Sequence, residues 1–328
     1  MRTFYDKDVD PEILRRRRVA ILGYGAQGRA HALNLRDSGI DVLVALREDS
    51  PSRVACTEAN LAVTTPEQAA EECDVVMLLV PDEIQPQIYQ QALAPRLKAG
   101  AALLFAHGYN IHFERLCPRA DLDVLMVAPL GIGDQVRATY AAGAGTPALL
   151  AVHQDFSGEA HQLGLSYAGA NGHGRAGIID TNFRDETITD LFAEQAVLCG
   201  GLTHLISAGF ETLVDAGYPQ ELAYFSCLHE VTLIADMIQR RGIAGMRGSI
   251  SSTAEFGDYT RGPRVINEAS REQMRKMLRE IEDSRFADEL DADARAGFPT
   301  LEAGRAKAQS HAIEAVGERL RAMMPWLR

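Results

Sequence analysis

The first half of the chain alternates short apolar runs with amphipathic segments. Five runs are rich in leucine or β-branched residues and are bounded by Gly, Pro or Asp: residues 18–25, 41–48, 74–82, 102–110 and 123–131. Such runs are typical of parallel strands that are buried on both faces. Between them lie helical patterns such as residues 65–73, where Thr65 is the expected N-cap and Pro66 the first helical residue. The alternation predicts a doubly wound α/β domain of the Rossmann type.

The pattern changes near residue 180. A sixth strand-like run at residues 147–155 and the helical segment after it are expected to complete the α/β domain, which we assign to residues 1–181. Residues 182–328 carry long amphipathic patterns and are assigned to an all-α domain, with its first helix broken at Gly200 and Gly201. Several of these helices are apolar nearly all the way round, which predicts burial in a large bundle or against a second subunit.

Composition narrows the class of protein. The 328 residues are 46% hydrophobic and carry a net charge of −12, with no basic block. Nucleic acid and an anionic membrane surface are therefore not expected as partners. The N-terminus has no apolar stretch of signal-peptide length, and no uninterrupted apolar run approaches 18 residues. These features predict a cytoplasmic protein.

The cysteines give no sign of a disulfide framework or a zinc site. They are odd in number, scattered and without CxxC spacing: Cys56, Cys73, Cys117, Cys199 and Cys227. We expect all five to be packing residues.

The first strand leads directly into a glycine-rich loop and then a helix. The loop has the GxGxxG pattern and consists of Gly23, Tyr24, Gly25, Ala26, Gln27 and Gly28. In a strand–loop–helix context this pattern predicts a dinucleotide site, with the pyrophosphate on the helix N-terminus. The alternative is that the glycines only form a turn.

The end of the second strand indicates which dinucleotide is bound. Arg47 is placed to pair with a 2′-phosphate, and the hydroxyls of Ser50 and Ser52 can donate to the same oxygens. NADPH is therefore the preferred cofactor. Glu48 and Asp49 keep NADH open, because either acid could bind the ribose diol instead.

Carboxylates interrupt two otherwise apolar helical patterns. Asp190 and Glu194 are four residues apart and so share a helix face, and Glu230 lies in a second helix. Oxygen ligands of this kind suit Mg²⁺. A solvated helix face is the alternative, and Ser226, four residues before Glu230, is not the second acid that a metal-binding pair would carry.

Seven stretches, in order along the whole chain, resemble the short form of the ketol-acid reductoisomerases of branched-chain amino-acid biosynthesis. They are FYDKD near the start, GYGAQG in the glycine loop, AHGYNIH at 106–112, DLFAEQAVLCGG at 190–201, AYFSCLHE at 223–230, STAEFGDY at 252–259 and LRAMMPWL at the end. The resemblance implies an NADPH- and Mg²⁺-dependent enzyme that migrates an alkyl group and then reduces a 2-keto acid. It also implies a knotted helical second domain and a homodimer with a shared active site.

Residue roles follow from the resemblance. It implies cofactor contacts at Tyr24–Gln27, Arg47, Ser50, Ser52, Pro81, Asp82–Gln85, His107 and Gly133. The implied metal ligands are Asp190, Glu194 and Glu230, and the implied catalytic residues are His107, Glu194 and Glu230. Substrate contacts are expected at Leu130, Ile132, Asp190, Glu194, Ser226, Glu230 and Ser251.

Several positions depart from the family pattern. The family reads Lys-Gly-Pro-Gly-His where this chain has Leu130, Gly131, Ile132, Gly133 and Asp134, and it has a glutamate where this chain has Ser226. Ile188 replaces a common acid, and Arg29 a common histidine. Losing a lysine and a metal-binding carboxylate argues against alkyl migration, which needs a clamp of two metals.

We therefore expect a reductase that acts on a C=O, C=N or activated C=C bond of a substrate other than acetolactate, in natural-product biosynthesis. Mg²⁺ becomes a doubtful cofactor. Two alternatives remain: a genuine ketol-acid reductoisomerase that tolerates the changes, and a non-catalytic NADPH-binding protein.

Overall fold

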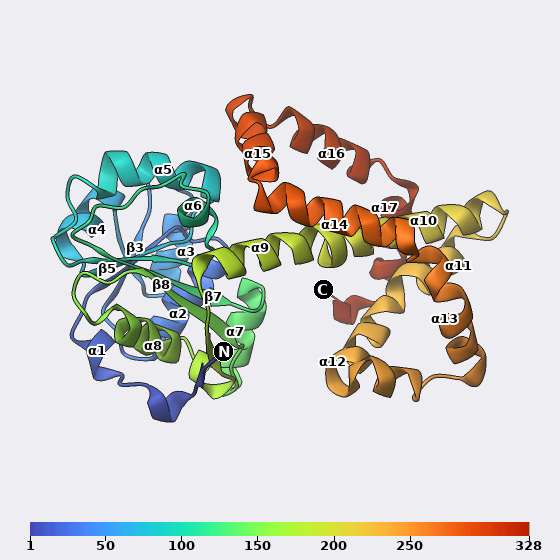
Figure 1. Cartoon of the computed structure of the whole chain (residues 1–328), viewed down its shortest axis with the longest axis horizontal. Coiled ribbons are helices and arrows are strands. Elements are labelled where there is room, and N and C mark those ends of the chain that lie inside the picture. Colours follow the sequence, from blue (N-terminus) through green and yellow to red (C-terminus); the bar gives the residue numbers. More distant parts are fainter. Residues whose placement is uncertain (328) are drawn as a thin grey trace. The chain divides into compact units, whose positions relative to one another are not determined.

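The computed structural model describes residues 1–327, and the chain divides into two compact units, Met1–Thr187 and Ile188–Arg328. The first unit holds a nine-stranded sheet with helices, and the second is helical (Figure 1). The boundary expected between residues 181 and 182 lies just before helix α9 (Phe183–Ala193), which carries the chain from one unit into the next.

The five apolar runs of the first half all form strands of one parallel array, as predicted. They are β2 (Val19–Leu22), β3 (Val42–Ala45), β5 (Val75–Leu78), β6 (Ala102–Phe105) and β7 (Asp123–Pro129). The order along the sheet is β1-β9-β8-β7-β6-β5-β2-β3-β4. The chain therefore reverses direction across the sheet at β2, whose neighbours are β3 and β5. In open α/β sheets ligands bind at such a switch point, outside the carboxyl ends of the strands.

Four further strands extend the array. The predicted sixth strand is β8 (Ala148–Gln154), which runs antiparallel to β7. The hydrophobic pattern did not predict β1 (Thr3–Phe4), β4 (Ala62–Thr64) and β9 (Ile178–Asp180). These strands have two or three residues each, too few to show a hydrophobic period.

Helices cover both faces of the sheet (Figure 1). One core lies under α1 (Glu12–Arg15), α2 (Ala26–Asp37), α3 (Ser52–Glu58) and α8 (Ala160–Ala170). The other lies under α4 (Pro66–Glu72), α5 (Gln85–Ile88) with its π-helical extension η3 (Tyr89–Leu93), and α6 (Tyr109–His112). Thr65 caps α4 as predicted, with its hydroxyl accepting the Gln68 N–H at 3.3 Å.

The second unit begins with a long apolar helical stretch that the two glycines do not break. Helix α9 passes through a π-helical turn, η5 (Glu194–Leu198), and α10 (Gly200–Asp215) starts at the glycines. A Cβ at Gly200 would lie 2.1 Å from the Gln195 carbonyl oxygen, and one at Gly201 would lie 2.2 Å from that of Ala196. The prediction of a break was wrong because these glycines fit the wide turn rather than end the helix.

The next helix has the same construction. Helix α11 (Gln220–Tyr224) runs into a π-helical turn, η6 (Phe225–His229), and continues as α12 (Val231–Arg247), which bends at Gly242 where φ is +70°. The remaining helices are α13 (Ser252–Val265), α14 (Glu268–Glu282), α15 (Arg285–Arg295), α16 (Pro299–Gln309) and α17 (Ala312–Ala322).

The stretch Phe183–Asp215 is long and apolar enough, by length and mean hydropathy, to cross a membrane, although no uninterrupted apolar run in it approaches 18 residues. Only 6% of its most apolar window is buried within the chain.

Two cysteines contradict the expectation that all five are packing residues. Cys56 and Cys73 are buried, but Cys117 and Cys199 are exposed, because the first lies in a loop and the second on this open helical stretch.

Two neutral histidines are enclosed in the first unit. The His31 Nδ1 lies 2.9 Å from the Tyr167 hydroxyl, and the His173 Nδ1–H donates to the Thr146 carbonyl at 2.6 Å. Both Nε2 atoms are buried without a partner among the described residues. Burial lowers the pKa of His31 to about 3 and that of His173 to about 4.

These histidines should make the protein acid-labile. Below about pH 6.5 the unfolded chain binds protons that the folded chain refuses, so stability falls as pH drops toward 4. Each histidine contributes about 1.4 kcal/mol per pH unit. In urea unfolding at pH 7.5, 6 and 5, His31→Gln should lose stability less steeply than the wild type, whereas His204→Gln, at an exposed position, should match it. Equal slopes for all three proteins would contradict this assignment.

Candidate functional site

The glycine loop is built for close backbone approach. At Gly23 φ is +103°, and a Cβ there would lie 2.5 Å from the Leu79 carbonyl oxygen. A Cβ at Gly28 would meet the Gly23 carbonyl oxygen at 2.3 Å. A Cβ added at Gly25, the N-cap of α2, would meet nothing within 4 Å, and no side chain caps this helix. Helix N–H groups without a capping side chain can bind a pyrophosphate.

The turn after β3 presents the three residues expected at the 2′-phosphate. The Ser50 N–H donates to the Arg47 carbonyl at 3.1 Å, and Arg53 holds the Leu46 and Arg47 carbonyls. The Arg47 side chain is 80% exposed, and its Nε lies 3.9 Å from Asp49. Ser50 and Ser52 are half-buried beside it. Since a 3.9 Å exposed pair is weak, the Arg47 guanidinium remains available to a phosphate.

The loops after β5 and β6 are tied to each other. The Gln85 side chain donates to the Val80 carbonyl and to Asp82 at 2.9 and 3.0 Å, and it accepts from Asn110 at 3.0 Å. Gln85 is buried, so it fixes this loop from within. Burial raises the pKa of Asp82 to about 6, against the opposing effect of nearby His107.

Glu186, which was not among the predicted site residues, orients His107. The His107 Nδ1–H donates to the Glu186 Oε1 at 2.9 Å, and the Gly108 N–H donates to the Glu186 Oε2 at 2.8 Å. Glu186 is 3% exposed on α9. A buried carboxylate fixes the tautomer and plane of the ring and leaves proton exchange to Nε2. The available signal was its position four residues before Asp190, on the same helix face.

The stretch after β7 docks on the glycine loop. The Gln27 side chain donates to the Gly131 carbonyl at 2.8 Å, and a Cβ at Gly133 would lie 2.2 Å from the Ala26 backbone. Leu130 and Ile132 are 50% and 72% exposed on either side of Gly131. This stretch therefore combines a fixed backbone with an apolar outer face.

The predicted cofactor residues meet at one edge of the sheet. They follow the carboxyl ends of β2, β3, β5, β6 and β7, and parallel strands bring these ends together. His107, Leu130, Ile132 and Gly133 belong to the same edge.

The predicted metal residues lie in the second unit, at its two π-helical turns. Asp190 lies on α9 and Glu194 opens η5, both exposed on one helical stretch. Ser226 lies within η6, and Glu230 follows it directly. Turns of this type are frequent at functional sites. The exposed carboxylates of Asp190 and Glu194 fit a hard cation that keeps several waters, whereas the Ser226 hydroxyl brings no charge.

Ser251 has a structural task in addition to its predicted role. It is the N-cap of α13, and its hydroxyl accepts the Ala254 N–H at 3.2 Å. A substrate contact at Ser251 stays a prediction.

The contact between Gly133 and Ala26 should control cofactor affinity. Gly133→Ala places a methyl group against the backbone of the glycine loop and must displace it. We expect NADPH binding to weaken at least about tenfold, measured by fluorescence titration. Gly304→Ala, at a helical position with nothing within 4 Å, is the control and should bind as the wild type does. Unchanged affinity in Gly133→Ala would show that the loop tolerates the displacement.

The Glu186 carboxylate should matter for turnover rather than for cofactor binding. Glu186→Gln keeps an acceptor for one of the two N–H groups but removes the charge beside His107. We expect kcat to fall about 10- to 100-fold with an unchanged dissociation constant for NADPH. If NADPH affinity fell by the same factor as kcat, the variant would instead have disrupted the whole loop. In the double variant, His107→Asn should add little to the kcat loss that Glu186→Gln causes alone.

Known proteins resemble both parts of the chain. Residues 13–177 match the family model "Acetohydroxy acid isomeroreductase, NADPH-binding domain", and residues 183–326 match "Ketol-acid reductoisomerase, C-terminal domain". An NADH-preferring ketol-acid reductoisomerase from an uncultured archean is similar at 45% identity and a TM-score of 0.96, over 98% of this chain and 99% of that one.

More distant structures share only the fold. A semialdehyde dehydrogenase NAD-binding protein from Cupriavidus necator is 21% identical, with a TM-score of 0.61 over 81% of this chain and 99% of that one. A 1-pyrroline-5-carboxylate reductase from Streptococcus pyogenes is 13% identical, with a TM-score of 0.52 over 80% and 97%. The two matched domains span nearly the whole chain, which therefore belongs to the ketol-acid reductoisomerase family of nicotinamide-dependent oxidoreductases.

Proposed function

We propose that this protein is an NADPH-dependent reductase that retains the hydride-transfer half of its family's reaction and has lost the alkyl-migration half. The observation that carries the proposal is the pair of apolar side chains, Leu130 and Ile132, exposed beside an intact glycine loop. Its substrate would be a C=O, C=N or activated C=C compound other than acetolactate, made in a specialised pathway.

The choice of NADPH rests on the turn after β3. Arg47, Ser50 and Ser52 offer a guanidinium and two hydroxyls in one turn, and Asp49 approaches Arg47 only to 3.9 Å. A 2′-phosphate would replace this weak exposed pair by charge-assisted bonds. One 45%-identical relative prefers NADH, so the preference varies within the family and must be argued from these side chains.

Hydride transfer makes modest demands on the protein. NADPH, when bound, supplies the hydride, and the protein must supply a proton to the atom that gains charge. His107 suits this task because Glu186 fixes its ring through Nδ1. Glu194 and Glu230 are further candidates for holding or moving a proton. A divalent cation, when bound by Asp190, Glu194 and Glu230, would polarise the bond to be reduced.

Alkyl migration demands more than these residues offer. It requires an alkoxide and a neighbouring carbonyl to be held together by two cations. Ser226 removes one carboxylate from that clamp, and Leu130 removes a positive charge. Each loss costs several kcal/mol of transition-state stabilisation, or about 100-fold in rate. With the lysine gone and the acids retained, neutral or cationic substrates should be favoured over anionic ones.

An ordinary ketol-acid reductoisomerase is the second candidate. It is favoured by 45% identity to a member with that activity over 98% of the chain. In that case a water would take the place of the missing carboxylate at the metal.

Substrate tests separate the candidates. Purified protein with Mg²⁺ and NADPH is offered 2-acetolactate, the corresponding isomerised 2-keto acid, and a panel of ketones and cyclic imines. The proposal expects NADPH oxidation with a panel compound or the isomerised acid, at least about 100-fold faster than with 2-acetolactate. Turnover of 2-acetolactate at rates usual for relatives would establish the second candidate. NADPH binding without consumption would indicate a non-catalytic protein.

A double variant sharpens this test. Leu130→Lys with Ser226→Glu should harm the reductase activity and raise turnover of 2-acetolactate. The matched control, Leu130→Met with Ser226→Ala, keeps both positions uncharged and should gain no activity on 2-acetolactate. If the charged pair leaves the reductase activity intact, these two positions do not face the substrate.

We further propose that the protein is a homodimer in which the helical unit is covered by a second copy. Many large apolar side chains of this unit are exposed: Val197, Leu198, Leu202, Leu205, Leu222, Leu233, Ile234, Ile243 and Phe256. Large apolar side chains exposed in this number support an interface with a second copy. The apolar stretch Phe183–Asp215 could suggest a membrane span, but the family match supports a soluble cytoplasmic enzyme. Sedimentation equilibrium without detergent tests the dimer and should give twice the mass of one chain.

A further inference from the structure

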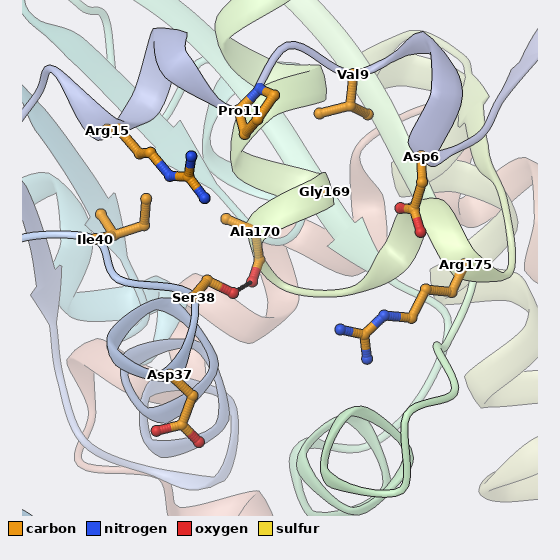
Figure 2. A pocket seen from close by; sticks show the side chains of 10 residues that line it. All are labelled: Asp6, Val9, Pro11, Arg15, Asp37, Ser38, Ile40, Gly169, Ala170 and Arg175. Atoms are coloured by element: carbon orange, nitrogen blue, oxygen red, sulfur yellow. Dashed lines mark hydrogen bonds between the residues drawn. The ribbon is translucent and has the colours of Figure 1, made fainter.

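A pocket lies in the first unit, away from the cofactor edge. It has a volume of about 430 Å³ and is formed by the N-terminal segment, the end of α2 and the end of α8 (Figure 2). Arg15 precedes β2 and Ile40 precedes β3, so the pocket lies at the amino ends of these parallel strands. The glycine loop follows the carboxyl end of β2. The two sites are therefore on opposite edges of the sheet.

The pocket walls are fixed by direct contacts. The Ser38 hydroxyl donates to the Ala170 carbonyl at 2.6 Å, which joins the end of α2 to the end of α8. The Leu14 N–H donates to the Ser166 hydroxyl at 3.1 Å, which joins α1 to α8. A Cβ at Gly169 would lie 2.7 Å from Val9. The cavity is thus preformed rather than a gap between mobile segments.

Two guanidinium groups point into the pocket from opposite sides (Figure 2). Arg15 donates one bond to Glu12 at 2.6 Å, and Arg175 uses Nη1 for the Tyr140 and Ala144 carbonyls. The Arg175 guanidinium also lies over the Tyr140 ring, 4.6 Å from its centroid, and its hydrogen bonds in the described part of the chain use Nη1 alone. Both side chains therefore retain donors for an additional acceptor.

The two carboxylates of the pocket, Asp37 and Asp6, differ in whether they can contact a ligand. Asp37 accepts from Arg36 and Arg137 at 2.7 and 2.6 Å, which holds its pKa below the usual range, and it points away from the pocket centre in Figure 2. The Asp6 carboxylate faces the pocket near Arg175 and has no side-chain partner in the described part of the chain. Val9, Ile40 and Ala170 supply apolar surface between these charges.

We propose that this pocket binds a small organic anion, a carboxylate or phosphate with an aliphatic body, between Arg15 and Arg175. Guanidinium forks bind such oxyanions through paired charge-assisted bonds, and the apolar wall accommodates the carbon chain. A donor group next to the anion, such as an ammonium or hydroxyl group, would face Asp6. The site is distinct from the cofactor site and does not depend on the reaction proposed above.

Calorimetric titration of the full chain, saturated with NADPH and Mg²⁺, tests the site. Saturation keeps inorganic phosphate from the cofactor's own phosphate positions. The probes are inorganic phosphate, pentanoate and norvaline, and we expect dissociation constants on the order of 0.1–1 mM for at least one of them. Tighter binding of norvaline than of pentanoate, with the difference removed by Asp6→Asn, would assign an amino acid. Phosphate binding alone would assign a phosphate.

Variants decide whether the pocket is the binding site. Arg15→Gln should weaken binding at least about tenfold, and Arg16→Gln, an adjacent exposed arginine outside the pocket, should not. Arg175→Gln should act like Arg15→Gln, but it also removes bonds to two carbonyls, so Arg15→Gln is the decisive variant. Absence of binding by all three probes, or binding that persists in Arg15→Gln, would overturn the proposal.

Discussion

The contact between two glycine-bounded turns determines the geometry of the cofactor edge. Gly133 approaches the backbone of Ala26 so closely that no Cβ fits, and Gln27 donates to the Gly131 carbonyl across the same gap. This contact joins the switch point at β2 to the end of β7. It fixes the backbone from which Leu130 and Ile132 emerge, so these two exposed side chains stand on a closely packed turn.

Glu186 plays a comparable part for His107. Its two oxygens accept from the ring of His107 and from the Gly108 backbone N–H, so one buried carboxylate fixes both a side chain and a loop. Gly108 also leaves no room for a Cβ against Thr187 and the Phe183 carbonyl. The loop after β6 and the start of α9 are thus one rigid piece, and the histidine keeps a single orientation without the help of a ligand.

The sequence was sufficient to predict the parallel array and the dinucleotide loop, because buried parallel strands leave continuous apolar runs and such a loop has strict glycine requirements. It did not reveal β1, β4 and β9, whose pairing depends on neighbours distant along the chain. The prediction of a helix break at Gly200 and Gly201 was wrong. A π-helical turn is defined by backbone hydrogen bonds between residues five apart, and these leave no hydrophobic period in the sequence. The pairing of Glu186 with His107 joins residues 79 positions apart, and only the fold brings them together.

The π-helical turns η5 and η6 change the direction in which side chains emerge along their helices. A π-helical turn holds one more residue than the α-helical turn it replaces, so every side chain after it is rotated by about 100° relative to those before it. The acids at Asp190 and Glu194 are therefore in one angular phase, and the apolar positions of α10 are in another. Ser226, within η6, is separated in the same way from the apolar positions of α12. On both helical stretches the residues before or within the wide turn and the apolar residues after it therefore face in different directions.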